Sequence, residues 1–181
     1  MKIQIEVKPV LPELWCDLED LFESRGSPHY CWCMAWRVNE NRKQVPSKDG
    51  KKAAMQSRVN SKTPVGILGY HDGKPIAWCS IAPRETYRKL SGDNTLDDVW
   101  SLVCFFVQRP FRNRGITQTL LSAAIDYARA NGARFVEAYP VEPDSTTYRF
   151  MGLVPAFEDA GFQFVKKAGT KRNVMIRQVS S

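Results

Sequence analysis

A run of nine residues at 99–107, VWSLVCFFV, is almost continuously apolar and constrains the fold more than any other segment of the chain. Its length suits a strand, and a strand that is apolar on both sides is typical of one that is covered on both faces. A short basic turn follows the run, and then apolar residues recur at helical spacing from Leu120 to Ala128. A buried strand followed by a helix predicts an α/β or α+β fold with one central sheet.

The spacing of apolar residues predicts further elements on both sides of this run. Two apolar runs separated by Asp72 and Gly73, a pair typical of tight turns, predict a β-hairpin. Asn131 and Gly132 are expected to end the central helix, because glycine is common just past a helix C-terminus. The predicted elements, in chain order, are a strand at 2–8, a helix at 11–22, a loop at 39–50, a basic helix at about 51–59, hairpin strands at 65–70 and 75–81, the strand at 99–107 and its helix, a strand at 135–141, a short helix at about 155–160 and a last strand at 174–179.

The composition is that of a single globular domain spanning residues 1–181. Hydrophobic residues make up 43% of the chain and charged residues 25%, which fits neither a disordered nor a fibrous chain. No apolar run reaches the roughly 18 residues that cross a bilayer, and the first residues lack the long apolar stretch of a secretion signal. We therefore expect a cytoplasmic protein with no membrane partner.

The formal net charge of +7 is distributed unevenly. Residues 42–62 carry seven bases and one acid, residues 101–120 three bases and no acid, and residues 160–181 five bases and no acid. The rest of the chain is net negative, so attraction of an anionic ligand to one place fits better than a basic coat for nucleic acid. We expect no nucleic-acid partner, because the chain also lacks a recognisable nucleic-acid-reading motif.

The five cysteines form an odd set, and reduced thiols are the default in the cytosol. The segment His29-Tyr30-Cys31-Trp32-Cys33 holds metal-ligand residue types, but a zinc site normally adds a second, distant pair of ligands. We expect buried thiols in an aromatic core segment and no metal. Cys79 and Cys104 lie in predicted core strands, where packing is a simpler interpretation than an acyl-cysteine intermediate.

The turn between the apolar strand and the helix combines Arg112, Arg114 and Gly115. The first N–H groups of a helix have no intrahelical partner and carry positive potential, so anions bind there. Guanidinium groups add charge, and a glycine lets the backbone approach a phosphate closely. The turn lacks the glycines of the P-loop and of the GxGxxG motif, so the sequence predicts a pyrophosphate site of another class.

The segment Arg112-Asn113-Arg114-Gly115-Ile116-Thr117 resembles the pyrophosphate-binding motif of the GCN5-related N-acetyltransferases (GNATs), in which Arg or Gln is followed by two residues, Gly, one residue, and Gly or Ala. Thr117 departs from the last position of that motif. Residues 106–112 resemble the end of the family's fourth strand, and residues 157–162 resemble its short helix that ends in Gly-Phe. The resemblance covers nearly the whole chain and implies the GNAT fold, a mixed central sheet of about six to seven strands, flanked by helices, with splayed central strands.

The resemblance also implies an acyltransferase that uses acetyl-CoA, or another acyl-CoA, as its co-substrate. In such a protein the backbone of Phe106 and Val107 binds the pantetheine arm. The residues expected to hold the pyrophosphate are Arg112, Asn113, Arg114, Gly115, Ile116 and Thr117.

Acetyl transfer to an amine requires a base that takes the amine proton, and an acid often protonates the departing thiolate. The family's usual acid, a Tyr four residues before the Gly of the Gly-Phe pair, is replaced here by Phe157. Tyr139, Tyr148 and water are the remaining candidates for the acid, and packing in the core is the alternative for each tyrosine.

Glu137 is the favoured base, because a carboxylate between apolar residues of a buried strand is costly unless it is paired or faces a cleft. The alternative is a structural ion pair with one of three arginines, Arg84, Arg88 or Arg134.

The region after the first helix covers the acceptor in the resembling family. Aromatic rings there supply apolar walls or a cation–π surface for a cationic amine, and Arg37 is placed to hold a carboxylate. The candidate acceptor-binding residues are Tyr30, Trp32, Trp36 and Arg37, with core packing as the alternative for the two tryptophans.

The sequence thus predicts an N-acyltransferase that acetylates a primary amine of a small molecule, by direct attack in a ternary complex. A non-catalytic CoA-binding module and an acetyltransferase acting on a protein amine are the alternatives. Dimers are common in the resembling family, which leaves a homodimer open.

Overall fold

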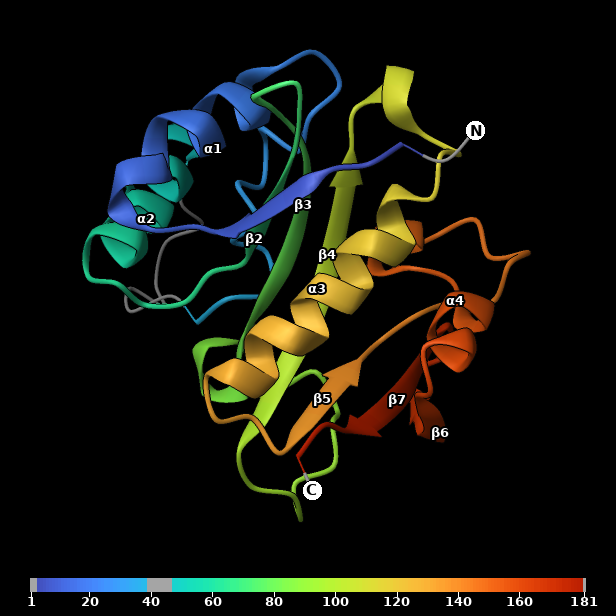
Figure 1. The fold of residues 1–181 in the computed structure, drawn as a ribbon. Helices are drawn as coiled ribbons and strands as arrows, with labels where there is room; N and C mark the ends of the chain where they lie inside the picture. The colour runs from blue at the N-terminus through green and yellow to red at the C-terminus, as the bar shows by residue number, and fades with distance from the viewer. Residues whose placement is uncertain (1–2, 39–46, 181) are drawn as a thin grey trace.

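The computed structural model describes residues 3–38 and 47–180, and within these residues it shows one seven-stranded sheet with helices on both faces (Figure 1). The strand order is β1-β2-β3-β4-β5-β7-β6. Strands β4 and β5 are parallel, and all other neighbours are antiparallel. The strands are β1 (Glu6–Pro9), β2 (Ile67–His71), β3 (Lys74–Pro83), β4 (Val99–Val107), β5 (Phe135–Ala138), β6 (Gln163–Ala168) and β7 (Arg172–Gln178).

Four α-helices are described, and they pack on the two faces of this sheet. Helices α1 (Trp15–Glu23) and α2 (Lys48–Asn60) cover one face, where their apolar side chains join a core with Trp78 and Phe106. Helices α3 (Ile116–Ala130) and α4 (Val154–Asp159) contribute to the second core, on the opposite face. Figure 1 shows α3 crossing in front of the central strands. No helix among the described residues is both long and apolar enough to span a membrane.

The central part of the chain agrees with the sequence prediction. Every residue of β4 is buried, and α3 buries its apolar stripe from Ile116 to Ala128 against the sheet. The hairpin of β2 and β3 turns at Asp72 and Gly73, both with positive φ. Helix α2 begins a turn earlier than predicted, because the Ser47 side chain accepts a hydrogen bond from the N–H of Gly50 and caps the helix. The loop predicted at 39–50 lies largely outside the described residues.

Strand β6 was not expected from the sequence. Five of its six residues are exposed, so the strand shows no alternation of apolar and polar side chains. It is the last strand of the sheet in the order above, and Lys166 and Lys167 on it are exposed. Charged side chains on an edge strand prevent another strand from pairing with it, which explains a sequence that does not resemble a strand.

The two parallel strands at the centre of the sheet diverge. Only Val99–Leu102 of β4 pairs with β5, and the rest of β4 has no strand partner on that side in the described part of the chain. The strand predicted at 135–141 therefore ends at Ala138, and Val141 forms isolated bridges with Leu153 and Arg172 instead. The resulting fork opens toward the carboxyl end of β4, which is the end that leads into α3.

Candidate active site

The turn before α3 has the backbone of an anion-binding site. Gly115 precedes the helix in the left-handed region, at φ 79°, and Asn113 has φ 60°. The N–H group of Thr119 makes the first intrahelical bond, to the carbonyl of Gly115, so the N–H groups of the three residues before it remain for a ligand. Helix polarity gives these groups positive potential. The turn can therefore hold a phosphate through backbone donors.

The side chains of this turn divide into exposed and buried ones. Arg112, Asn113 and Arg114 are exposed, whereas the side chain of Ile116 is buried in the core below α3. Ile116 can thus serve a ligand only through its backbone N–H group.

Val107 lies at the mouth of the fork. The N–H of Gln108 donates to the carbonyl of Ile76 on β3, so the alternation of an antiparallel pair turns the amide groups of Val107 toward the fork. The Val107 carbonyl already accepts a hydrogen bond from Nε of Arg112, at 2.9 Å. Of the two backbone groups of Val107, the N–H is the one left for the pantetheine arm. Phe106 contributes its side chain to the core under α1 and α2.

Glu137 forms the centre of a buried polar cluster at the base of the fork, where it faces Ser101 across the β4–β5 pair. Its side chain has no exposed surface. Oε1 accepts hydrogen bonds from Nε of Arg84 (3.0 Å), Ser101 Oγ (2.7 Å) and the Tyr139 hydroxyl (2.5 Å). Oε2 accepts a further bond from Nη2 of Arg84, at 2.7 Å, which completes a two-pronged ion pair. The structure thus shows the ion pair that was the alternative for Glu137, with Arg84 as the partner, and the same residue lines a cavity.

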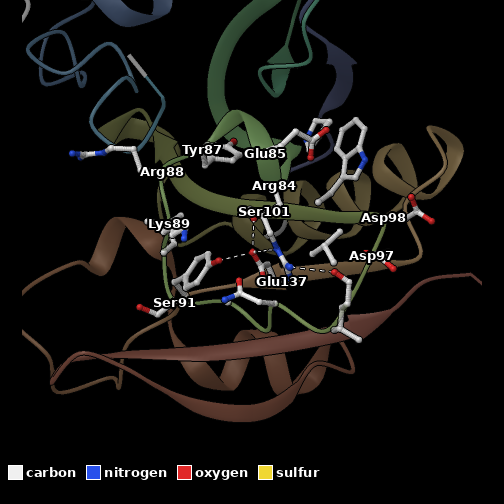
Figure 2. Close-up of a pocket in the computed structure, with 18 of the residues that line it drawn as sticks. Arg84, Glu85, Tyr87, Arg88, Lys89, Ser91, Asp97, Asp98, Ser101 and Glu137 are labelled. Carbon is white, nitrogen blue, oxygen red and sulfur yellow. Dashed lines mark hydrogen bonds and ion pairs between the residues drawn. The ribbon is translucent and has the colours of Figure 1, made fainter. Parts of the chain in front are cut away.

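The polar cluster borders a cavity of about 950 Å³. Figure 2 shows Arg84 reaching from the segment after β3 toward Glu137. The loop between β3 and β4 forms much of the wall, including Arg88, Leu90 and Gly92. A Cβ atom on Gly92 would lie 2.2 Å from Oε2 of Glu137, so only glycine lets the loop pass over the carboxylate.

The Tyr139 hydroxyl donates its proton to Glu137 within this cluster. Burial raises the pKa of Tyr139 well above its usual range, and the neighbouring Glu137 charge raises it further. The hydroxyl therefore keeps its proton at neutral pH. Tyr139 also lines the cavity, which places an exchangeable proton between the cavity and a buried carboxylate.

Phe157 occupies the position of the family's acid and is buried among aromatic rings. Its ring centroid lies 5.1 Å from that of Phe162 and 6.2 Å from that of Phe105. The edge of its ring approaches Gly152 so closely that a Cβ atom there would lie 2.5 Å from Phe157 Cε2. Phe157 has no proton to donate, and its ring fills the core under α4.

The candidate acceptor residues are not brought together. Tyr30 is 72% exposed, whereas Trp32 is fully buried, with its ring stacked between those of Trp15 and Phe22. Trp36 is half-buried, and its ring lies 6.2 Å from that of Tyr148, centroid to centroid. Trp32 therefore packs in the core, which was its alternative, and Trp36 contacts a partly exposed ring, that of Tyr148.

The prediction that Arg37 holds a carboxylate of the acceptor is wrong, because the side chain is only 1% exposed. Its Nη2 donates to the Val65 carbonyl at 2.5 Å and to Ser80 Oγ at 3.0 Å. The guanidinium carbon lies 4.6 Å from the ring centroid of Tyr87. No described carboxylate pairs with Arg37, and its Nε and Nη1 have no hydrogen-bond partner among the described residues.

Cys33 lies beside this buried cation. The Cys33 thiol is within hydrogen-bonding reach of Cys104, Ser80 and Trp78. The hydrogen bond from Cys104 and the charge of Arg37 hold the pKa of Cys33 below its usual range, against the opposing effect of burial. Trp32 and Cys33 both have positive φ, a conformation that non-glycine residues rarely adopt, and it is this backbone that directs Cys33 inward. The neighbouring guanidinium thus favours the thiolate form of Cys33.

The described residues do not form the ligand groups that metal sites require. In residues 3–38 and 47–180, no three His, Cys, Asp or Glu side chains are grouped so that they could hold a metal ion. The segment from His29 to Cys33 contains one buried thiol, that of Cys33, and Cys31 is half-buried.

Comparison with protein-family models matches residues 18–152 to the acetyltransferase (GNAT) family. The match spans most of the chain and includes the fork, the turn before α3 and the Glu137 cluster. The chain belongs to the GNAT acetyltransferase family. A search of curated proteins found no match.

Solved structures of GNAT proteins share the fold at low sequence identity. The acetyltransferase of the GNAT family from Streptococcus pneumoniae is 12% identical, with a TM-score of 0.59, and the alignment covers 98% of this chain and 100% of that one. The putative acetyltransferase yncA from Salmonella typhimurium, solved with its cofactor acetyl-CoA, is 14% identical, with a TM-score of 0.59 and coverage of 99% and 96%. PaiA N-acetyltransferase from Thermoplasma acidophilum, solved with coenzyme A, is 16% identical, with a TM-score of 0.57 and coverage of 97% and 99%.

Within this GNAT chain, the sequence does not decide the roles of three residues that surround Glu137. Arg84 is one of three possible partners of Glu137 in the sequence, and no pattern there connects Ser101 or Gly92 to Glu137. Ser101 interrupts the apolar run of β4, and a polar residue inside a buried strand is the signal that could have revealed it. The approach of Gly92 depends on the path of a long loop, which no local pattern encodes.

Proposed function

We propose that this GNAT enzyme transfers an acetyl group from acetyl-CoA to the primary amine of a small molecule, by direct attack of the amine in a ternary complex. The observation that carries the proposal is the fork between β4 and β5 that opens toward the N-terminus of α3. Two proteins with the same fold were solved with acetyl-CoA or coenzyme A, which supports the same co-substrate here.

The residues present at the fork fit an acyl-CoA. The backbone donors at the start of α3 and the exposed guanidinium groups of Arg112 and Arg114 suit a pyrophosphate. The N–H of Val107 suits an amide carbonyl of the pantetheine arm, which then runs along the unpaired part of β4. Acetyl-CoA supplies an activated acyl group whose thioester carbonyl the amine attacks.

Tyr139 and Glu137 provide a route for the amine proton. As the amine nitrogen bonds to the acetyl carbon, the nitrogen gives a proton to the oxygen of Tyr139, and the Tyr139 proton moves to Oε1 of Glu137. The 2.5 Å distance between these two oxygens suits such a transfer. The thiolate leaves as its bond to the acetyl carbon breaks, and it takes a proton from water, because Phe157 has none.

Arg84 and Ser101 act as positioning residues in this proposal. They hold the Glu137 carboxylate on the side of Tyr139 through hydrogen bonds to both of its oxygens. The cavity beside this cluster gives a small acceptor access to Tyr139 without entry from the CoA side of the fork.

The test is thiol release from acetyl-CoA across a library of small amines and peptides, with the acetylated product identified by mass spectrometry. Wild type should acetylate a small amine. Tyr139→Phe should lower kcat by about 10²- to 10⁴-fold and leave acetyl-CoA binding unchanged, because proton transfer contributes about that factor. Tyr127→Phe, a half-buried tyrosine of α3 outside the site, is the matched control.

Background thiol release with every amine would favour the non-catalytic CoA-binding module, the alternative that the missing acid at Phe157 suggests. Acetylation of peptides alone would favour a protein amine as the acceptor. Equal kcat in Tyr139→Phe and wild type would contradict the proton route through Tyr139.

A further inference from the structure

Arg172 begins β7 and lies where the fork opens. Val141, just beyond the end of β5, forms an isolated bridge with Arg172. The guanidinium carbon of Arg172 lies 5.1 Å from the ring centroid of Trp36, 5.6 Å from that of Tyr148 and 5.9 Å from that of Tyr139. Three aromatic rings, one from the segment after α1 and two from the segment that follows β5, thus surround one cation.

This cation has no anionic partner among the described residues, since none of their carboxylates forms an ion pair with Arg172. Its Nη1 is buried and has no hydrogen-bond partner there. Aromatic faces attract a guanidinium but do not replace the oxygen acceptors that its N–H donors require. Nη1 of Arg172 is therefore a buried hydrogen-bond donor without an acceptor among the described residues.

Two residues that line the cavity beside Glu137 connect it to the Arg172 cluster. Tyr139 lines that cavity and presents its ring to Arg172 while its hydroxyl donates to Glu137. Arg88 also lines the cavity, and its guanidinium carbon lies 5.7 Å from the ring centroid of Trp36. A molecule that extends from the cavity past the Tyr139 ring and toward Trp36 therefore reaches Arg172.

Two of the three aromatic neighbours are accessible. Tyr148 is 37% exposed and Trp36 is half-buried. Tyr148 follows an exposed segment and has φ 57°, a backbone conformation that non-glycine residues rarely adopt. In this conformation its ring lies near Arg172. Solvent can reach the cluster from the side of Tyr148.

We propose that Arg172 binds the carboxylate of the acceptor, which makes the acceptor an amino acid whose side chain packs on Trp36 and Tyr148. The inference rests on the proposed function, which requires an amine, and adds the carboxylate that the unpartnered guanidinium requires. An arginine binds a carboxylate through two parallel hydrogen bonds, and this pairing would satisfy Nη1.

The test compares L-phenylalanine with its amide, which has the same side chain and amine but no carboxylate. The measured quantity is the ratio of kcat/KM for the acid to kcat/KM for the amide. This ratio should be roughly 10- to 100-fold higher in wild type than in Arg172→Gln, as expected for a charge-assisted pair. The lower basicity of the amide's amine affects both enzymes equally, so it cancels in the comparison. Arg172→Lys should keep part of the preference, because it keeps the charge and loses the two-pronged geometry.

Lys171→Gln is the matched control, because it removes a neighbouring exposed charge and leaves Arg172 in place. It should keep the wild-type preference. Titration with acetyl-CoA shows whether each variant is folded, and a ratio of two substrates on one enzyme does not change with a partial loss of folded protein.

An acid-to-amide ratio that is the same in wild type, Arg172→Gln and Arg172→Lys would overturn the inference and leave the proposed function standing. Transfer to no amine at all, by a wild type that binds acetyl-CoA, would instead overturn the proposed function and this inference with it.

Discussion

Glu137 carries its charge with no exposed surface, and the structure compensates this charge through four hydrogen bonds. The sequence indicated that this carboxylate must be paired or face a cleft, and it does both. The choice of Arg84 over Arg88 and Arg134 was not accessible, because the three arginines look alike in sequence. What distinguishes Arg84 is the turn Arg84–Thr86, which directs its side chain back to the base of the fork.

Glu137→Gln should destabilise the protein by about 3 kcal/mol, because loss of one partner leaves Arg84 without its counter-charge in a largely buried site. Urea denaturation at neutral pH measures the free energy of unfolding. Glu158→Gln, the same change at an exposed position of α4, should have an effect within about 0.5 kcal/mol. Equal losses in the two variants would contradict the role of the ion pair in the fold.

For Arg37, in contrast to Glu137, the prediction from the sequence was wrong. An arginine after an aromatic segment suggested a surface site for a carboxylate, but the side chain is buried beside Cys33. The sequence does not tell whether an arginine is buried or exposed when the apolar residues around it recur at no regular spacing. The two consecutive residues with positive φ, Trp32 and Cys33, explain why residues 27–37 showed none.

At the scale of elements, the strength of the periodic pattern decided what could be predicted. Strand β4 was predicted to the residue, because it is buried on all sides, and the end of α3 was predicted closely from its apolar stripe and Gly132. The start of α3, at Ile116, lies within the segment that was predicted as a turn. The fork followed from the family resemblance and not from any local pattern. Strand β6 was missed because an exposed edge strand has no such pattern.

The Cys33 thiol should make the free energy of unfolding depend on pH. The folded-state pKa of Cys33 lies below the unfolded value, so its contribution is complete above the unfolded pKa and is lost as pH falls through the folded pKa. The free energy of unfolding, from urea titrations in reducing buffer, should therefore fall between about pH 9 and about pH 6. Cys104 and Tyr87, whose pKa values are raised by their surroundings, keep their protons through this window.

Cys33→Ala should remove this part of the pH dependence, and Cys16→Ala, at an exposed position of α1, should retain it. The same slope in wild type and Cys33→Ala would show that Cys33 is a neutral thiol in the folded protein.

At the scale of the whole molecule, the basic residues behind the net charge of +7 have different roles in different parts of the chain. In the window 42–62, Lys52 bridges α2 to Glu19 and Glu23 of α1. In the window 160–181, Lys166 and Lys167 protect the edge of the sheet, and Arg172 stands at the fork. In the window 101–120, the exposed Arg112 and Arg114 belong to the proposed pyrophosphate site. A homodimer stays a prediction, since nothing in the single chain tests it.

The central claim is that the start of α3 holds the pyrophosphate of acetyl-CoA, and calorimetric titration of acetyl-CoA tests it most directly. Gly115→Glu places a carboxylate where the phosphates would bind and should weaken binding at least about 100-fold, a loss of roughly 2.7 kcal/mol. Gly132→Glu is the matched control, because Gly132 has a similar φ of 87° at the other end of α3 and open space around it. Wild-type affinity in Gly132→Glu together with the loss in Gly115→Glu is the predicted result. No binding by wild type, or equal affinity in the two glycine variants, would contradict the claim.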